Sequence, residues 1–217
     1  DVGSGLGSST VITSANKHGW RLRAPSDGNG ENYMASEPNW GKVVPTANAA
    51  DGTKYDITML WQARMSTVAG MHWFLGIVGG GEPSASVPLS SAGALSTAEF
   101  VAGFHMDADT MTAPEMAIVG SVDRQVATDV RGGVPTIGNN TKHWFGVRII
   151  GLDKVDFYCG AKFNEIRRVG RITLSDTSNT FSLNSGFSPA FGVVGSQAGN
   201  HDVILHKMLL HQANIDA

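Results

Sequence analysis

The sequence has little charge, a single cysteine and no long apolar run, and each of these shortages excludes a class of protein. Charged residues make up 16% of the chain, below the usual quarter, and the net charge is −3. Nucleic-acid-binding domains carry a basic excess, so no nucleic-acid partner is expected. One cysteine cannot form a disulfide within the chain. A membrane-spanning helix needs roughly 20 apolar residues, so membrane insertion is not expected either.

Glycine is abundant instead, and its placement indicates an all-β fold. The chain has 27 glycines among 217 residues, and most lie between apolar runs, where the turns of a β-protein need them. A β-sandwich of this length is commonly one domain. We expect a flexible N-terminal segment over residues 1–10, which read DVGSGLGSST, and a single β-sandwich domain over residues 11–217.

Two segments give the clearest strand patterns. In YDITMLWQARM (55–65), apolar and polar residues alternate, and Leu60 is the single exception. Alternation with a period of two predicts a long strand with one buried face. The segment MHWFLGIV (71–78) is apolar on both faces, which predicts a central strand covered on both sides.

The middle of the chain predicts a three-stranded antiparallel meander. Its strands are HWFGVRII (143–150), VDFYC (155–159) and KFNEIRRV (162–169), and the connections between them are short. Further segments are expected to be strands at 99–106, 115–122, 124–130, 187–196 and 202–212, with a long loop at 79–96. A helix remains an alternative for 203–212, because its apolar residues are too dense to show a clean period. Many short strands separated by turns indicate a two-sheet sandwich.

The stretch KHWFGVRII-GLDK-VDFYCGAKF resembles the concanavalin A-like (laminin-G-like) jelly rolls. The resemblance rests on a Val-Arg-Ile strand, a short polar turn and a following strand with Phe157, Tyr158 and Gly160. It extends over roughly residues 55–212 and implies an all-β, two-sheet antiparallel jelly-roll sandwich. Such domains occur in lectins, glucanases, polysaccharide lyases and the surface or decoration proteins of tailed phages. The charge-poor, Gly/Ser/Thr/Ala-rich composition is similar to the last group.

Glycoside hydrolysis needs two carboxyl groups held at a fixed separation, and the sequence shows no such pair on one strand. The glucanases of this fold have an E-x-D-x-E pattern, which is absent here. The glutamates stand singly along the chain. We therefore predict no catalytic residue and no enzymatic activity, and no cofactor is expected.

The segment HMDAD (105–109) is the best candidate for a metal site. His105, Asp107 and Asp109 alternate, so an extended strand would point all three side chains the same way. One imidazole and two carboxylates could hold a divalent ion. The alternative is a strand end that passes into a polar, solvated turn with no ligand.

Trp144 and Arg148 are the candidate carbohydrate-binding residues. They share the strand face opposite Phe145, Val147 and Ile149. An aromatic ring beside a hydrogen-bond donor on a sheet face is what sugar stacking needs. The alternative is that Trp144 packs in the core or in a subunit contact.

Cys159 alternates with Phe157 and Val155, so it should face the same core. A thiol in apolar surroundings is unreactive. We therefore predict a structural, buried cysteine.

These features favour a non-enzymatic structural protein that works through interfaces. The composition predicts a virion component, such as a phage capsid decoration or appendage protein, located on the virion surface or outside cells. Its partners would be other virion proteins or copies of itself.

A lectin-like carbohydrate-binding module with glycans as partners is the alternative, and a polysaccharide-degrading enzyme is the third reading. An exposed Trp144 and Arg148 would favour the lectin, and a cleft with two close carboxylates would favour the enzyme.

Overall fold

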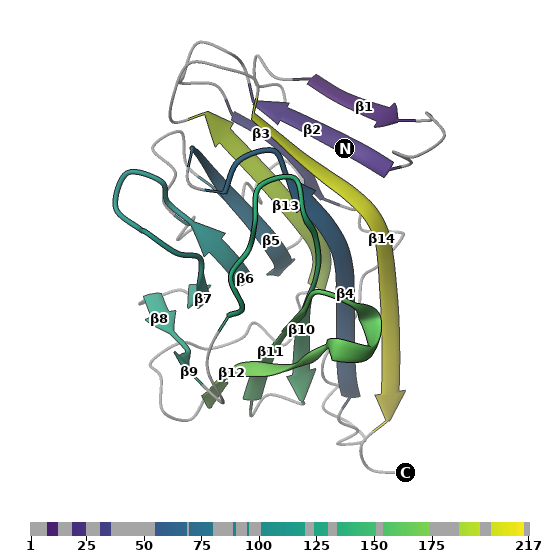
Figure 1. Cartoon of the computed structure of the whole chain (residues 1–217). Coiled ribbons are helices and arrows are strands. Elements are labelled where there is room, and N and C mark those ends of the chain that lie inside the picture. Colours follow the sequence, from purple (N-terminus) through teal and green to yellow (C-terminus); the bar gives the residue numbers. More distant parts are fainter. Residues whose placement is uncertain are drawn as a thin grey trace.

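Two antiparallel sheets pack face to face (Figure 1). The computed structural model describes residues 8–12, 19–24, 31–35, 55–68, 70–79, 89, 95, 101–119, 124–129, 134–150, 154–173, 187–195 and 201–214. The eight-stranded sheet has the order β1 (Ser8–Ile12), β2 (Gly19–Ala24), β14 (His201–Asn214), β4 (Tyr55–Met65), β10 (Lys142–Ile150), β11 (Lys154–Gly160), β12 (Arg167–Thr173) and β9 (Thr128–Asp129). The six-stranded sheet has the order β3 (Glu31–Ala35), β13 (Phe187–Gly195), β5 (Met71–Gly79), β6 (Val101–Met106), β7 (Glu115–Val119) and β8 (Arg124–Val126).

The main core lies between the inner faces of the two sheets. Strand β4 buries one face, including Trp61 and Met65, and leaves the alternate residues partly exposed. Phe145 and Phe157 of the same sheet meet Phe104 of the six-stranded sheet, with ring centroids 5.1 and 5.9 Å apart. These edge-to-face contacts are the favoured geometry for aromatic rings. The predicted period-two strand over 55–65 is confirmed.

The outer face of the six-stranded sheet carries a second, smaller core. Leu89 and Leu95 pair in an isolated bridge and are buried against this face with Phe74, Val101 and Ala190. Strand β5 is therefore buried on both faces, as its apolar sequence predicts. Most of the predicted loop 79–96, like residues 1–7 of the predicted N-terminal segment, lies outside the described residues. Strand β1 begins at Ser8, within that segment, and the division into domains stays a prediction.

The meander is present as β10, β11 and β12, but its third strand begins later than predicted. Residues 162–169 do not form one strand, because Phe163–Glu165 is a 3₁₀ turn and β12 starts at Arg167. The turn is held by the Glu165 amide, which donates to the Lys162 carbonyl at 3.0 Å. A backbone irregularity between Phe157 and Tyr158 then shifts the register of β11 against β12.

Strand β14 lies between β2 and β4 in the eight-stranded sheet. The helical alternative for 203–212 is therefore wrong. It pairs with β2 along 201–205 and with β4 along 203–214, and a bulge interrupts it between Leu205 and Lys207. Backbone pairing with β4 along 203–214 explains why a dense apolar run forms a strand. Among the described residues, no helix is long and apolar enough to cross a membrane.

Candidate functional site

A buried histidine and two aspartates meet at one end of the six-stranded sheet. His72 lies on β5, and its side chain points to the outer face because Met71 and Trp73 face the core. Asp107 and Asp109 lie in the turn that follows β6. One potential ligand atom from each of the three side chains lies within 4.8 Å of the other two. Residues far apart in the sequence thus form one cluster, which we call the cation cluster.

Hydrogen bonds within the turn hold the two aspartates in place. Oδ1 of Asp107 accepts from the Asp109 amide at 3.0 Å, and Oδ2 accepts from the Thr110 hydroxyl at 2.8 Å. The Asp107 carbonyl accepts from the Met111 amide at 2.8 Å. An aspartate that caps its own turn in this way gives a defined conformation to a short loop. The turn is therefore ordered before any ligand binds.

His72 contacts both carboxylates with its ring nitrogens. Nδ1 lies 3.1 Å from Oδ1 of Asp107 and Nε2 lies 3.7 Å from Oδ2 of Asp109. The Ala108 amide also donates to Nδ1 at 3.1 Å. His72 is almost fully buried, whereas the Asp109 side chain is 69% exposed. The cluster thus has a buried imidazole at its base and a carboxylate open to solvent.

The pKa of Asp107 lies below its usual value. Partial burial opposes ionisation, but the Thr110 hydroxyl, the Asp109 amide and the nearby His72 and His105 outweigh it. Hydrogen bonds and positive charge favour the ionised form of a carboxyl group. Asp107 is therefore an anion at neutral pH, which is the form that ligates a metal.

His105 does not join the cation cluster, although it alternates with both aspartates in the sequence. Strand β6 ends at Met106, and the chain then turns, so the alternation does not continue beyond that residue. His105 stays on the sheet and its Nδ1 lies 3.4 Å from Oε1 of Glu115, its register partner on β7. The structure thus brings Asp107 and Asp109 together, and it supplies His72 in place of His105.

Trp144 and Arg148 lie on the outer face of the eight-stranded sheet, opposite the core residues Phe145 and Val147, as predicted. They do not form an open platform. Trp144 is only 4% exposed, and its ring packs edge-on against Phe163 at 5.1 Å. Arg148 is engaged by Asp56, and its Nε donates to Oδ1 at 2.8 Å. The arrangement that would favour sugar stacking on Trp144 is therefore absent.

Hydrogen bonds to Asp56 and Tyr158 raise the pKa of the Arg148 guanidinium well above its usual value. Next to it, Arg171 binds Asp156 through two nitrogens, at 2.5 and 2.7 Å. The arginines and aspartates thus form a cross-strand charge network. Such pairs stabilise neighbouring strands of a sheet, and we assign Arg148 this structural part.

The fold is shared with solved lectins, although no family model and no curated protein matches the chain. A structure of peanut lectin with a nine-residue peptide has a TM-score of 0.59 at 12% identity, covering 99% of this chain and 92% of that one. The carbohydrate recognition domain of Emp46p, in a potassium-bound form, has a TM-score of 0.59 at 11% identity, with 97% and 87% covered. A legume lectin-like domain from Entamoeba histolytica has a TM-score of 0.58 at 8% identity, with 99% and 89% covered.

The fold is a concanavalin A-like sandwich. The predicted fold class is confirmed by the two antiparallel sheets and by these lectin neighbours. A protein of unknown function from Shewanella oneidensis shares the fold as well, with a TM-score of 0.53 at 11% identity, covering 100% of this chain and 80% of that one. At these identities, the likeness establishes the architecture and leaves the activity to be argued from the site.

Sequence reasoning missed His72, and one signal could have found it. His72 is the only polar side chain in the run MHWFLGIV. Its partner strand is β6, on which Phe104 and Met106 face the core while His105 shares the outer face. A lone histidine in a strand buried on both faces needs a polar partner. That reasoning would have directed attention to the aspartates after β6, but only once the pairing of β5 with β6 was known.

Proposed function

We propose that this chain is a lectin-like carbohydrate-binding domain whose site is organised by a divalent cation at His72, Asp107 and Asp109. The meeting of these three side chains on an ordered turn carries the proposal. The lectin neighbours support it, because they include the carbohydrate recognition domains of Emp46p and Emp47p and a winged bean lectin bound to the Tn-antigen.

The residues present fit a divalent ion. Carboxylate oxygens suit Ca²⁺ and Mn²⁺, and an imidazole nitrogen suits Mn²⁺ and Zn²⁺. A mixed set of one histidine and two aspartates therefore favours Mn²⁺ or Zn²⁺ over Mg²⁺. When bound, the ion would supply positive charge that offsets two close carboxylates. The chain's own residues then present the exposed edge of the turn, Asp109 and Thr110, to a sugar hydroxyl.

Cation binding can be tested directly by thermal unfolding of the intact chain with and without Mn²⁺ or Zn²⁺. A ligand at 100 times its Kd stabilises a protein by about 2.7 kcal/mol. For a chain of this size, about 1 kcal/mol shifts Tm by roughly 2–4 °C. We expect a rise of roughly 5–10 °C that His72→Ala and Asp107→Asn each reduce to less than half.

The matched control is Glu165→Gln, which removes an exposed carboxylate in the 3₁₀ turn before β12, where Glu165 pairs with Lys162 at 3.2 Å. This variant should keep the full cation-induced shift. Equal shifts in His72→Ala and the unchanged chain would contradict the proposed cluster.

Glycan binding is tested by an array screen of the same chain, run with Mn²⁺ and again with a chelator. We expect binding that the chelator and His72→Ala both weaken at least tenfold. Glu165→Gln should bind as the unchanged chain does. No signal on the array from a chain that binds the cation would leave the cluster in place and refute the glycan part.

A structural role through self-association is the second candidate, and one observation favours it. Met208, Leu209 and Leu210 on β14 are each nearly half exposed. Beyond Leu205, β14 pairs with β4 on one side, and no described strand pairs with its other side. An apolar strand edge of this kind favours pairing with another chain.

That such an assembly lies on a virion stays a prediction. A location outside cells also stays a prediction. The solved neighbours named above are lectins, lectin-like domains and a protein of unknown function. The absence of enzymatic activity is consistent with those neighbours and also stays a prediction.

A further inference from the structure

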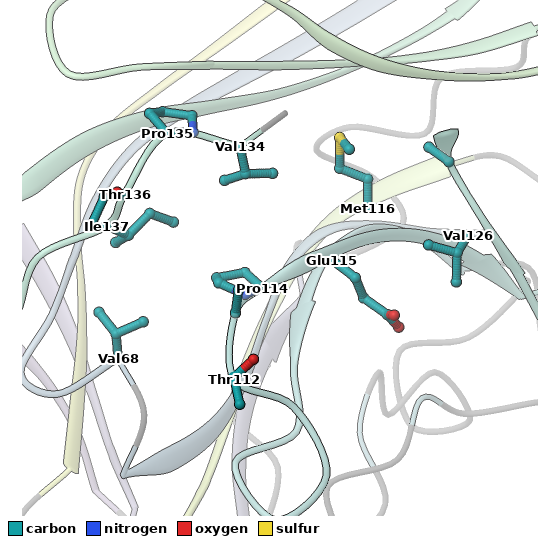
Figure 2. A pocket seen from close by; sticks show the side chains of 12 residues that line it. Val68, Thr112, Pro114, Glu115, Met116, Val126, Val134, Pro135, Thr136 and Ile137 are labelled. Atoms are coloured by element: carbon teal, nitrogen blue, oxygen red, sulfur yellow. The ribbon is translucent and has the colours of Figure 1, made fainter. Parts of the chain in front are cut away.

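A pocket of about 500 Å³ opens beside the edge where the two sheets meet, and Figure 2 shows side chains that line it. Small-molecule sites in proteins measure about 300–1,000 Å³, whereas packed interiors contain few voids larger than a water molecule. Nine of the twelve side chains that line the pocket are apolar. They include Val68, Pro114, Met116, Val134 and Ile137.

The pocket exists because the chain changes sheets at this point. Ala127 lies between β8 of one sheet and β9 of the other, and its amide donates to the Met116 carbonyl at 2.8 Å. Val134 and Ile137 come from the strand-free segment before β10, and Val68 comes from the turn after β4. Short strands and irregular segments do not interdigitate as the central strands do, so a space remains between them that is lined by apolar side chains and by polar atoms.

The Met116 side chain forms one wall of the pocket, and Gly170 of β12 limits where that side chain can move. A Cβ atom on Gly170 of β12 would lie 2.6 Å from the Met116 sulfur and 2.8 Å from its terminal carbon. The thioether is therefore packed against a glycine and has no room to move toward β12. The space on its other side is the pocket.

The charges of the lining select among apolar ligands. Among the lining residues, Glu115 is the one ionisable side chain, and the lining has no lysine, arginine or histidine. Oε1 of Glu115 lies 3.4 Å from His105, and its carboxylate points away from Val134 and Ile137 (Figure 2). Thr112 and Thr136 are exposed and offer hydroxyl groups at the mouth. A fatty acid would find no cation for its carboxylate here.

We propose that this pocket binds a neutral, amphipathic small molecule. The ligand removes the partly exposed Val and Pro side chains of the lining from water, which stabilises the complex by about 25 cal/mol per Å² of apolar surface buried. Its one polar end faces Thr112 or Thr136. The proposal is separate from the glycan function, because it uses none of the three side chains of the cation cluster.

The test uses N-phenyl-1-naphthylamine, a neutral probe that fluoresces in apolar surroundings. We expect saturable binding of one probe per folded chain. Dodecanoate should compete at least tenfold more weakly than dodecanol of the same chain length, because the pocket has no basic group. Weak probe binding that does not saturate would overturn the proposal.

Ala113→Trp fills the pocket from an exposed position on its wall. This change should abolish saturable binding while Tm stays within about 2 °C of the unchanged chain. Ala161→Trp places the same ring on the exposed turn after β11 and is the matched control, so it should bind the probe normally. Equal probe binding by the two variants would place the probe elsewhere and refute the assignment.

Two further variants test the named walls. Gly170→Ala should push the Met116 thioether into the pocket and weaken probe binding severalfold. Glu115→Gln should strengthen binding of dodecanoate relative to dodecanol by removing the carboxylate. Unchanged binding in Gly170→Ala would contradict the wall assignment, and an unchanged ratio in Glu115→Gln would contradict the charge argument.

Discussion

At the scale of single residues, burial decides what Cys159 can do. The side chain is fully buried in the main core, and burial raises the pKa of the thiol to about 12, with the Gly160 amide and Arg167 only partly opposing it. The thiolate is the reactive form. We expect iodoacetamide at pH 8 to modify the folded chain at least 100-fold more slowly than the chain in denaturant. Mass spectrometry of timed samples would measure both rates, and similar rates would contradict the burial.

The same thiol makes stability depend on pH in the alkaline range. Below pH 9.0, the ordinary value, the thiol is protonated in both states and has no effect. Between 9.0 and about 12, the unfolded chain releases the proton and the folded chain keeps it, so the free energy of unfolding falls as pH rises. The stability of the unchanged chain relative to Cys159→Ala should fall by about 1 kcal/mol from pH 9.5 to 10.5. Urea titrations at the two pH values would measure this change.

At the scale of the element, the outer face of β11 depends on an ion pair. The Asp156 side chain is only 1% exposed, and Arg171 of β12 binds it through two nitrogens. Removing one partner of a buried pair leaves an uncompensated charge. Because Arg171 is partly exposed and Arg168 stays 3.7 Å from Asp156, we expect Arg171→Met to cost about 2 kcal/mol.

Urea unfolding would measure this loss, with Arg167→Met as the matched control. Arg167 is exposed on the same strand, so its replacement should change stability by less than about 0.5 kcal/mol. The double variant Asp156→Asn/Arg171→Met should be more stable than Arg171→Met alone. A double variant that is less stable would show that the charge of Asp156 is not the cause.

Strand patterns were predictable from the sequence where side chains alternate, and so was the pairing within the meander, but the pairing of segments far apart in the sequence was not. The alternation in 55–65 and the double burial of 71–78 follow from which residues avoid water, which is a local property. The 3₁₀ turn at Phe163–Glu165 and the bulge after Leu205 arise from the need to fit neighbouring strands. The same limit explains why sequence reasoning missed His72. The sequence places His72 35 residues before Asp107, and only the pairing of β5 with β6 brings the two residues together.

At the scale of the whole molecule, the exposed edge of β14 predicts a dimer. Light scattering coupled to size exclusion should give a mass near twice 22.9 kDa at micromolar concentration. Leu209→Lys should restore the monomer, because a charge on a strand edge opposes pairing. Phe163→Lys is the matched control, since it removes another exposed apolar side chain, and it should stay dimeric. A monomeric unchanged chain would remove the support for a role in assembly.

The placement of β14 between β2 and β4 also sets an order of events during protein synthesis. Arg23 of β2 binds Asp202 of β14 at 2.7 Å, across nearly the whole length of the chain. A ribosome therefore releases β2 and β4 long before the strand that joins them. Until β14 emerges, the nascent chain exposes two unpaired strand edges and an unfinished core, a state that aggregates readily. Chaperone demand during translation thus follows from the position of one strand in one sheet.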